Sequence, residues 1–200
     1  MYDATVSARP RLNVLALPGS LRRGSFNRLL LQAAAASTPP GMQMQVYDDL
    51  ASVPLFSEDV EAQALPAGVE RLRDRVARAD AVLIATPEYN QSIPGVLKNA
   101  IDWLSRPPHE VLVGKPMAVI GATAGRWGTR LAQSHLRHVL YATEALVMPQ
   151  PSLFVAAAST LFDGAGGLVD EQTAGSLREL LVAFDGWIRR TGVILEALEV

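Results

Sequence analysis

The 200-residue chain contains no cysteine. This absence excludes disulfide bonds, a catalytic thiol, iron–sulfur clusters and zinc held by cysteine. Any oxidation or reduction carried out by the chain must therefore rely on a bound organic cofactor, or on a metal held by histidine and carboxylate side chains.

Histidine is also scarce, with three in the chain. His135 and His138 fall on one face of a predicted helix, but no HExxH pattern and no cluster of acidic residues accompanies them. We therefore predict no metal site and interpret these two histidines as surface or packing residues.

Long apolar runs and a large excess of one charge are missing as well. No apolar stretch approaches the ~18 residues that cross a bilayer, and residues 1–10 lack the apolar centre of a signal peptide. A formal net charge of −2 does not favour nucleic acid as a partner, and 49% hydrophobic residues are enough for a core. We expect a cytoplasmic protein without membrane insertion, with a flexible leader at 1–10 and a single domain over 11–200.

Several common motifs are absent too. The chain has no GxGxxG after its first apolar run, no Walker GK[ST] and no GxSxG elbow. No nucleophile or acid–base pair stands out, so we predict no catalytic side chain. A chain of this kind is typical of proteins whose cofactor carries the chemistry.

Strand-like and helix-like segments alternate along the chain. The apolar, strand-like runs are Arg11–Leu17, Met42–Tyr47, Ala81–Thr86, Met117–Gly121 and Leu146–Met148. Apolar residues at helical spacing mark Phe26–Ala33, Val69–Ala79, Leu97–Leu104, Leu131–Leu140 and Leu177–Ile188. The central runs are apolar on both faces, as in strands covered by helices on both sides. We predict an α/β fold with a flavodoxin-like, five-stranded parallel sheet, order 2-1-3-4-5, and helices on both faces.

The loop after the first strand is the strongest functional signal. Gly19–Asn27 joins a buried strand to a helix, and backbone N–H groups at such a helix start attract phosphate. Its hydroxyl and amide side chains, Ser20, Ser25 and Asn27, can add hydrogen bonds, and Arg22 can add a charged fork. The alternative is an ordinary strand–turn–helix with Ser25 as the N-cap.

Two further loops are predicted to reach the same edge of the sheet, because they follow the third and fourth strands. Thr86–Pro94 offers Tyr89 and the amides around Glu88–Asn90 to a planar ring, with Pro94 placed as the first residue of the next helix. Its alternative is a rigid turn in which Asn90 is left-handed. Ala122–Gly128 contains small residues that let backbone approach a ligand, although a plain strand-to-helix turn also explains them.

The sequences of the first two loops resemble one known family. Gly19–Asn27, taken together with Pro87–Trp103, is similar to the NADPH-dependent FMN reductases, which include bacterial chromate and quinone reductases and some azoreductases. The similarity extends roughly from Arg11 to Tyr141. It implies a flavodoxin-like fold, FMN as cofactor, NADPH or NADH as electron donor, and a homodimer or homotetramer.

The resemblance also assigns residues by position. It implies that the FMN phosphate is held by the first loop and that the isoalloxazine ring is bordered by the second, with the third loop beside them. The cofactor-binding residues so implied are Ser20, Arg22, Ser25, Phe26, Asn27, Pro87, Glu88, Tyr89, Asn90, Thr123 and Gly125. The third loop departs from the family pattern, because it carries Arg126 and Trp127 among its small residues. We hypothesise, from its place beside the second loop, that Arg126 anchors a nicotinamide phosphate of the donor.

For this family the implied reaction is ping-pong transfer of a hydride from NAD(P)H to FMN and then of electrons to a small acceptor. Quinones, azo compounds and metal oxyanions are the expected acceptors. The family's habit also favours a subunit interface at Lys98–Leu104, with Asn99 and Asp102 facing the partner, whereas Trp103 fits either an interface or core packing.

Two functions of other classes are also compatible with the residues. One is a flavodoxin-type electron carrier, which usually displays a strongly acidic docking face that a net charge of −2 does not favour. The other is a flavin-free α/β domain that binds a phosphorylated metabolite. Oxidation of NAD(P)H and the flavin absorbance bands distinguish these alternatives from the reductase.

Overall fold

The computed structural model describes residues 11–198, so the leader expected at 1–10 lies outside the described residues. Its sheet is formed by β1 (Leu12–Pro18), β2 (Met42–Val46), β3 (Ala81–Ala85), β4 (Pro116–Ala122), β5 (Leu146–Val147) and β6 (Leu153–Val155). All pairings are parallel, and the order is β2-β1-β3-β4-β5, with β6 also on β4. The predicted order 2-1-3-4-5 is confirmed.

The edge of the sheet consists of two short strands, β5 and β6, where one strand was predicted. β5 pairs with Pro116 and Met117, and the chain returns as β6 to pair with Ile120–Ala122. The intervening segment contains Pro149 and Pro151, which have no N–H to donate to β4. The single strand expected at Leu146–Met148 is therefore corrected to two short strands.

Five helices lie where the apolar spacing predicted them: α1 (Phe26–Ala36), α3 (Ala67–Arg78), α4 (Gly95–Leu104), α5 (Arg130–Tyr141) and α6 (Glu171–Leu198). α4 begins one residue later than expected, because Pro94 is its N-cap. The short helix α2 (Glu58–Gln63) and the 3-10 turns Leu50–Ser52 and Ala158–Thr160 were not predicted. No helix of the described residues has both the length and the apolar character needed to span a membrane.

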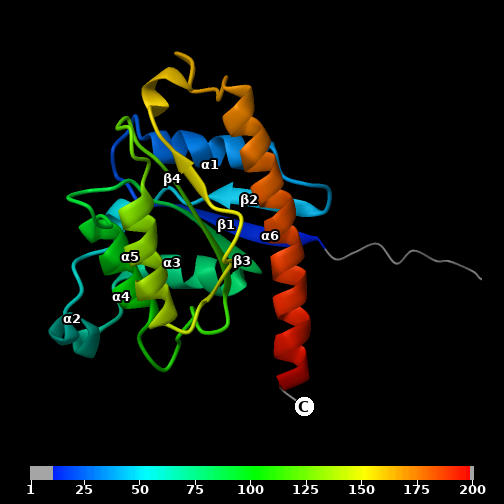
Figure 1. The fold of residues 1–200 in the computed structure, drawn as a ribbon. Coiled ribbons are helices and arrows are strands. Elements are labelled where there is room, and N and C mark those ends of the chain that lie inside the picture. The colour runs from blue at the N-terminus through cyan, green and yellow to red at the C-terminus, as the bar shows by residue number, and fades with distance from the viewer. Residues whose placement is uncertain (1–10, 199–200) are drawn as a thin grey trace, which may run out of the picture.

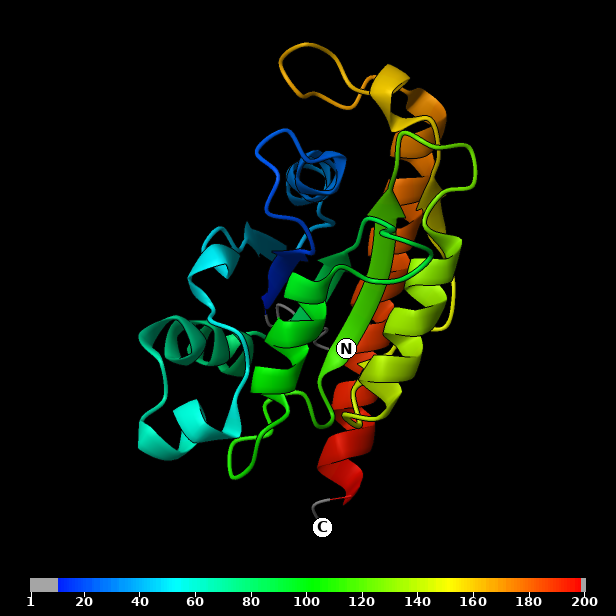
Figure 2. The same ribbon diagram turned by 90° about the vertical axis from the view of Figure 1, so that its left-hand side faces the viewer.

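Helices cover both faces of the sheet (Figures 1 and 2). α1 and α6 pack on one face, where Leu31 and Phe184 join the strand residues Ala16 and Leu83 in one core. α3, α4 and α5 pack on the other, where a second core surrounds Leu17 and Ile84. Alternate residues of β1 and β3 thus enter different cores, as the period of a strand requires.

Residues of α4 that were expected at a subunit interface lie inside this chain instead. Trp103 is fully buried, and its indole Nε1 donates to the Pro54 carbonyl at 2.9 Å. The amide of Asn99 donates to the same carbonyl at 2.8 Å and accepts from the Phe56 N–H at 2.7 Å. Core packing is therefore correct for Trp103, and the expectation that Asn99 faces a partner is wrong.

Candidate functional site

Three loops leave the sheet side by side at its carboxyl edge (Figure 1). Pro18 at the end of β1 is level with Ala85 of β3, which is level with Ile120 of β4. The ladder continues into the loops, since the Gly19 N–H donates to the Ala85 carbonyl at 2.8 Å and the Thr86 N–H to the Ile120 carbonyl at 3.0 Å. The edge predicted to hold a ligand is therefore assembled by regular strand pairing.

The first turn of α1 has free backbone donors. Within the part of the chain that the structure describes, the amides of Phe26, Asn27 and Arg28 have no hydrogen-bond acceptor. Ser25 occupies the N-cap position, but its side chain accepts no bond from the helix. The ordinary capping role considered for Ser25 is thus not realised, and the helix start remains available to an anion.

Positive charge accompanies these donors. The Arg22 guanidinium lies 5.3 Å from the ring centroid of Phe26, and no carboxylate among the described residues pairs with Arg22 or Arg23. Ser20 steadies the loop by accepting from the Arg22 N–H at 3.3 Å. Ser20, Arg22 and Arg23 line a cavity of about 290 Å³, together with residues that include Tyr47 and Asp48.

Asn27 connects the first loop to the third. It is 2% exposed. Its Nδ2 donates to the Ala122 carbonyl at 2.8 Å, and its Oδ1 accepts from the Ala122 N–H at 2.9 Å. The side chain therefore fixes the start of α1 to the end of β4, while the backbone N–H of Asn27 remains unpaired.

The second loop is a tight turn. The N–H groups of Tyr89 and Ser92 donate to each other's carbonyls at 2.9 and 3.0 Å, and Asn90 and Gln91 have φ values of 49° and 63°. The left-handed Asn90 that the sequence allowed is confirmed. The Tyr89 amide is used within the turn, whereas those of Glu88 and Asn90 have no acceptor among the described residues. The Tyr89 side chain is half exposed.

Glu88 has a contact that the sequence did not indicate. Its Oε2 accepts from the N–H groups of Leu131 and Ala132 at 2.9 and 3.0 Å. The carboxylate thus caps α5 from 43 residues away, and the charge suits the positive end of the helix dipole. No local pattern reveals a cap that is so distant in sequence.

The third loop is attached to the segment after β6. Thr123 donates its N–H to the Val155 carbonyl at 2.9 Å, and its Oγ1 accepts from the Gly125 N–H at 3.2 Å. Gly125 in turn accepts from the Ala157 N–H at 3.0 Å. These bonds hold the two predicted loop residues in place next to the carboxyl end of β4.

Gly121 is a site-forming residue that the sequence reasoning missed. A Cβ at this position would lie 2.1 Å from Thr129 Oγ1 and 2.4 Å from the Thr86 carbonyl oxygen. Only glycine therefore lets β4, the second loop and the start of α5 approach so closely. A glycine inside an apolar strand was the available signal.

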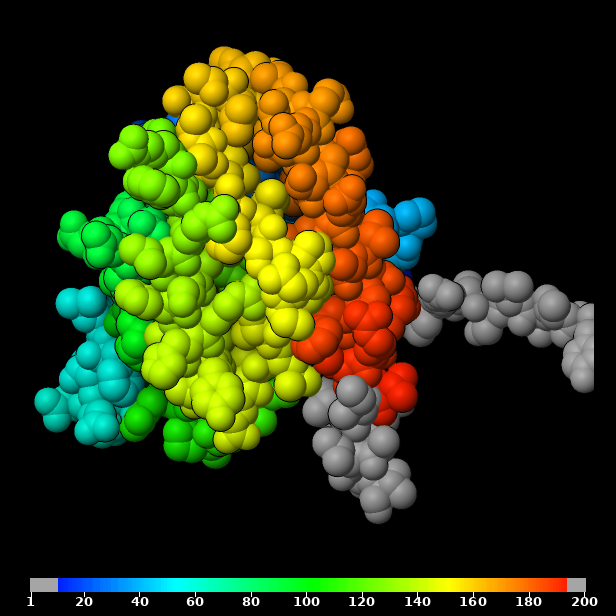
Figure 3. All heavy atoms as spheres, viewed as in Figure 1, coloured from blue at the N-terminus to red at the C-terminus, as the bar shows by residue number. Residues whose placement is uncertain are grey.

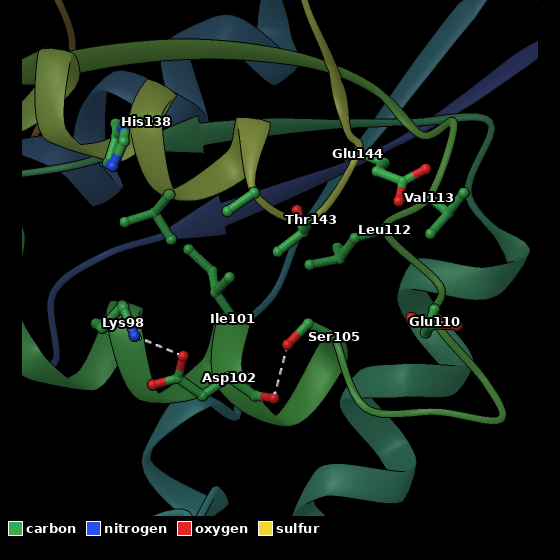
Figure 4. A pocket seen from close by; sticks show the side chains of 12 residues that line it. Lys98, Ile101, Asp102, Ser105, Glu110, Leu112, Val113, His138, Thr143 and Glu144 are labelled. Atoms are coloured by element: carbon green, nitrogen blue, oxygen red, sulfur yellow. Dashed lines mark hydrogen bonds and ion pairs between the residues drawn. The ribbon is translucent and has the colours of Figure 1, made fainter.

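Cavity volume by itself does not locate the site. A larger cavity of about 470 Å³ lies between α4 and α5 (Figure 4), and one of about 790 Å³ lies at the opposite, amino edge of the sheet. We place the site at the three loops because unpaired amides and unpaired arginines gather there. No group of metal-ligating side chains occurs among residues 11–198.

One family model and several known proteins match this chain. A family model described as NADPH-dependent FMN reductase matches residues 12–160. An NAD(P)H-dependent FMN reductase of Pseudomonas aeruginosa is 45% identical over 90% of this chain and 96% of its own length. A 2-hydroxy-1,4-benzoquinone reductase of a Burkholderia species is 39% identical over 89% and 97% of the two chains.

A solved structure extends the likeness to three dimensions. The flavoenzyme NAD(P)H:(acceptor) oxidoreductase FerB from Paracoccus denitrificans superposes with a TM-score of 0.82, at 35% identity, and covers 90% of this chain and 98% of its own. A quinone reductase of Escherichia coli is 38% identical over 92% of this chain. The likeness to FerB thus extends over most of the fold described above.

Proposed function

This chain belongs to the NADPH-dependent FMN reductase family, and we propose that it passes electrons from NADPH or NADH to quinones and other small acceptors by a ping-pong mechanism. It is an enzyme with FMN as its cofactor and NAD(P)H as its donor. Family membership sets aside the flavin-free alternative. The observation that carries the proposal is the open first turn of α1 beside the unpaired Arg22.

The first loop fits the phosphate of FMN. Three unpaired amides at the start of α1 point to an anion, and the hydroxyls of Ser20 and Ser25 lie in the same loop. Arg22 would add a charge-assisted hydrogen bond. Asn27 would contribute through its backbone N–H, because its side chain is bonded to Ala122. Phe26 would take part through its amide and through its contact with Arg22.

The second and third loops fit the isoalloxazine ring. Pro87–Asn90 presents the unpaired amides of Glu88 and Asn90, which would donate to the polar edge of the ring and stabilise negative charge there. Tyr89 offers an aromatic face. Glu88 would act by holding the second loop on α5, and Thr123 and Gly125 by shaping the backbone wall of the third loop.

The chain's own groups bind and orient in this mechanism. When bound, FMN would supply the redox chemistry, which is two-electron transfer from NAD(P)H to the acceptor. No side chain is assigned as an acid or base, and solvent delivers the protons. The Tyr89 side chain is half exposed, so the ring site beside it would be open to solvent. The donor and the acceptor would then bind at this site one after the other, which is why we propose ping-pong kinetics.

The acceptor class follows from chemistry and from relatives. Similar proteins are named for quinones, and a flat ring site suits a flat acceptor. We propose quinones as the principal acceptors, with azo compounds and metal oxyanions as further ones. We also propose the cytoplasm as the location, because NADPH and NADH are metabolites of that compartment.

Assembly is proposed to use the surface between α4 and α5. The cavity in Figure 4 lies between Lys98, Ile101 and Asp102 of α4 and the end of α5. A neighbouring cavity of about 510 Å³ shares Lys98 and His138 with it and reaches Ser92 of the second loop. A homodimer or homotetramer built on this surface would place a partner beside the candidate site. Sedimentation as a monomer at micromolar concentration would contradict this assignment.

A visible spectrum tests the function directly. The purified protein, loaded with FMN, is expected to lose its yellow absorbance on anaerobic addition of NADPH or NADH and to regain it on addition of a quinone. Initial rates at several quinone concentrations should give parallel double-reciprocal lines. A protein that keeps its absorbance with both donors would contradict the proposal.

A further inference from the structure

The third loop carries two residues, Arg126 and Trp127, that the proposed FMN site does not use. Its ends are held: Thr123 and Gly125 are bonded to Val155 and Ala157, and Gly128, with φ of 71°, packs on Phe154. Arg126 and Trp127 project between these anchors. The indole of Trp127 is 71% exposed, which is unusual for so large an aromatic side chain.

Two arginine side chains each lie over an aromatic ring in this region. The Arg126 guanidinium lies 5.0 Å from the Trp127 ring, and that of Arg130, the first residue of α5, lies 4.4 Å from the ring of Phe154. We call these four residues the Arg–aromatic patch. Within the described part of the chain, neither guanidinium pairs with a carboxylate. The patch therefore keeps two uncompensated positive charges.

The patch borders the candidate site. The third loop starts at the end of β4, beside the second loop, and Glu88 of the second loop is bonded to the residues that follow Arg130. Because Glu88 already occupies the N–H groups of Leu131 and Ala132, the start of α5 offers few backbone donors to an anion. Any anion that binds here must be recognised by the arginine side chains.

An exposed indole with one guanidinium over its ring, and a second guanidinium nearby at the start of α5, suits a planar aromatic ring that carries phosphate. The donor has such a part in its adenosine end, and NADPH differs from NADH there by one phosphate on the ribose. We infer that the Arg–aromatic patch binds the adenosine 2′-phosphate end of NADPH, with adenine stacked on Trp127 and the phosphate held by Arg126 and Arg130. The inference rests on the proposed function, and it makes NADPH the preferred donor.

Direct binding tests this without relying on turnover. The FMN-loaded protein, whose phosphate site is already filled, is titrated calorimetrically with 2′,5′-adenosine bisphosphate and with 5′-AMP at low salt. We expect the bisphosphate to bind at least tenfold more tightly, because one more phosphate meets the arginines. Added salt should weaken its binding.

The variants Arg126→Ala and Arg130→Ala are each expected to weaken bisphosphate binding about tenfold, with partial recovery in Arg126→Lys. Trp127→Leu should weaken the binding of both nucleotides about threefold to tenfold, whereas Trp127→Phe should retain most of it. Arg178→Ala, on the exposed surface of α6, is the matched control and should bind as the wild type does.

The outcomes separate the inference from the function. If the wild type does not bind the bisphosphate, or if the patch variants bind it unchanged, the inference is wrong even when NADPH and NADH both reduce the flavin. If Trp127→Leu changes the sedimentation coefficient but not the affinity, the indole belongs to an interface and the inference is again wrong. Failure of both donors to reduce the flavin overturns the function itself.

Discussion

Arg22 is the residue on which the proposed phosphate site depends most directly, because its guanidinium lies over the ring of Phe26, the first residue of α1, and has no carboxylate partner among the described residues. We expect Arg22→Ala to weaken FMN binding by about 1.5–3 kcal/mol, the usual contribution of a charged hydrogen bond. Equilibrium dialysis or flavin fluorescence measures this. Arg178→Ala should keep the wild-type affinity, and equal affinities for all three proteins would show that the loop is misread.

Tyr47, just after β2, carries a side-chain hydroxyl whose removal should not lower the stability of the fold at pH 7. Its side chain is 3% exposed and its hydroxyl has no partner within the described residues. Burial raises the pKa of Tyr47 above its usual 10.0, and the Asp49 carboxylate raises it further. A raised pKa means that the folded state holds the phenol proton more tightly than the unfolded state does. The stability linked to this proton is therefore present below pH 10 and is lost as the pH rises through the folded-state pKa.

We therefore expect Tyr47→Phe to be at least as stable as the wild type at pH 7, because an unpaired buried hydroxyl costs about 1–3 kcal/mol. The variant should also lose less stability than the wild type above pH 10. Urea unfolding at pH 7 and above pH 10 measures both effects. A variant that is clearly less stable at pH 7 would indicate that the hydroxyl has a partner in solution.

Single residues also show what a sequence leaves hidden. Ser25 and Arg22 were identifiable because a strand, a loop and a helix are contiguous. The cap from Glu88 to α5 and the brace from Asn27 to Ala122 join segments 43 and 95 residues apart. Such contacts depend on how the strands are ordered in space, and no spacing along the chain encodes them.

At the scale of elements, β4 is the strand against which the site is assembled. It pairs with β3, β5 and β6, and Gly121 lets it approach Thr86 and Thr129 closely. We expect Gly121→Ala to destabilise the fold by about 1–3 kcal/mol, as overpacking does, and to weaken FMN binding because the second and third loops must move.

Chemical unfolding and FMN titration measure the two effects of Gly121→Ala. Gly192→Ala is the matched control, since nothing lies within 4 Å of a Cβ at this position in α6. It should stabilise the helix by up to about 1 kcal/mol. Equal stability of Gly121→Ala and the wild type would mean that β4 has room to shift.

The apolar pattern of the sequence predicts some helices and strands better than others. Helix and strand positions were predicted well where a periodic apolar face packs on a core, as in α1, α3 and β3. The pattern did not reveal the break between β5 and β6. Both short strands are defined by their pairing with β4, and the spacing of apolar residues does not encode this pairing. The pattern also left the place of Trp103 open, since an apolar residue at a helix end suits a core and an interface equally.

The whole molecule is two cores separated by the sheet, and α6 covers one face along its length. Its Trp187 donates to the Leu146 carbonyl at 2.8 Å and so attaches the helix to the edge strand. In Figure 3 the orange-to-red helix lies directly against the yellow edge segment. The positions of the three loops therefore depend on the sheet and on the helices that cover both of its faces.

Because FMN binds only the assembled edge, we expect it to stabilise the whole fold. At a concentration of about 100 times its Kd, it should add about 2.7 kcal/mol, which raises the Tm of a chain of this size by roughly 5–10 °C. Differential scanning calorimetry measures the shift. Riboflavin, which lacks the phosphate, is the control, and an equal shift with riboflavin would contradict the role of the first loop.

The carboxylate of Glu88 also bears on how many phosphates this edge can accept. Of the two helix starts beside the first and third loops, α1 keeps three amides free, whereas the Leu131 and Ala132 amides of α5 are already occupied by Glu88. Helix-terminus amides are therefore available to a phosphate at α1, and a phosphate near α5 would depend on arginine side chains instead. One glutamate thus divides this edge into a phosphate site made by backbone and one made by side chains.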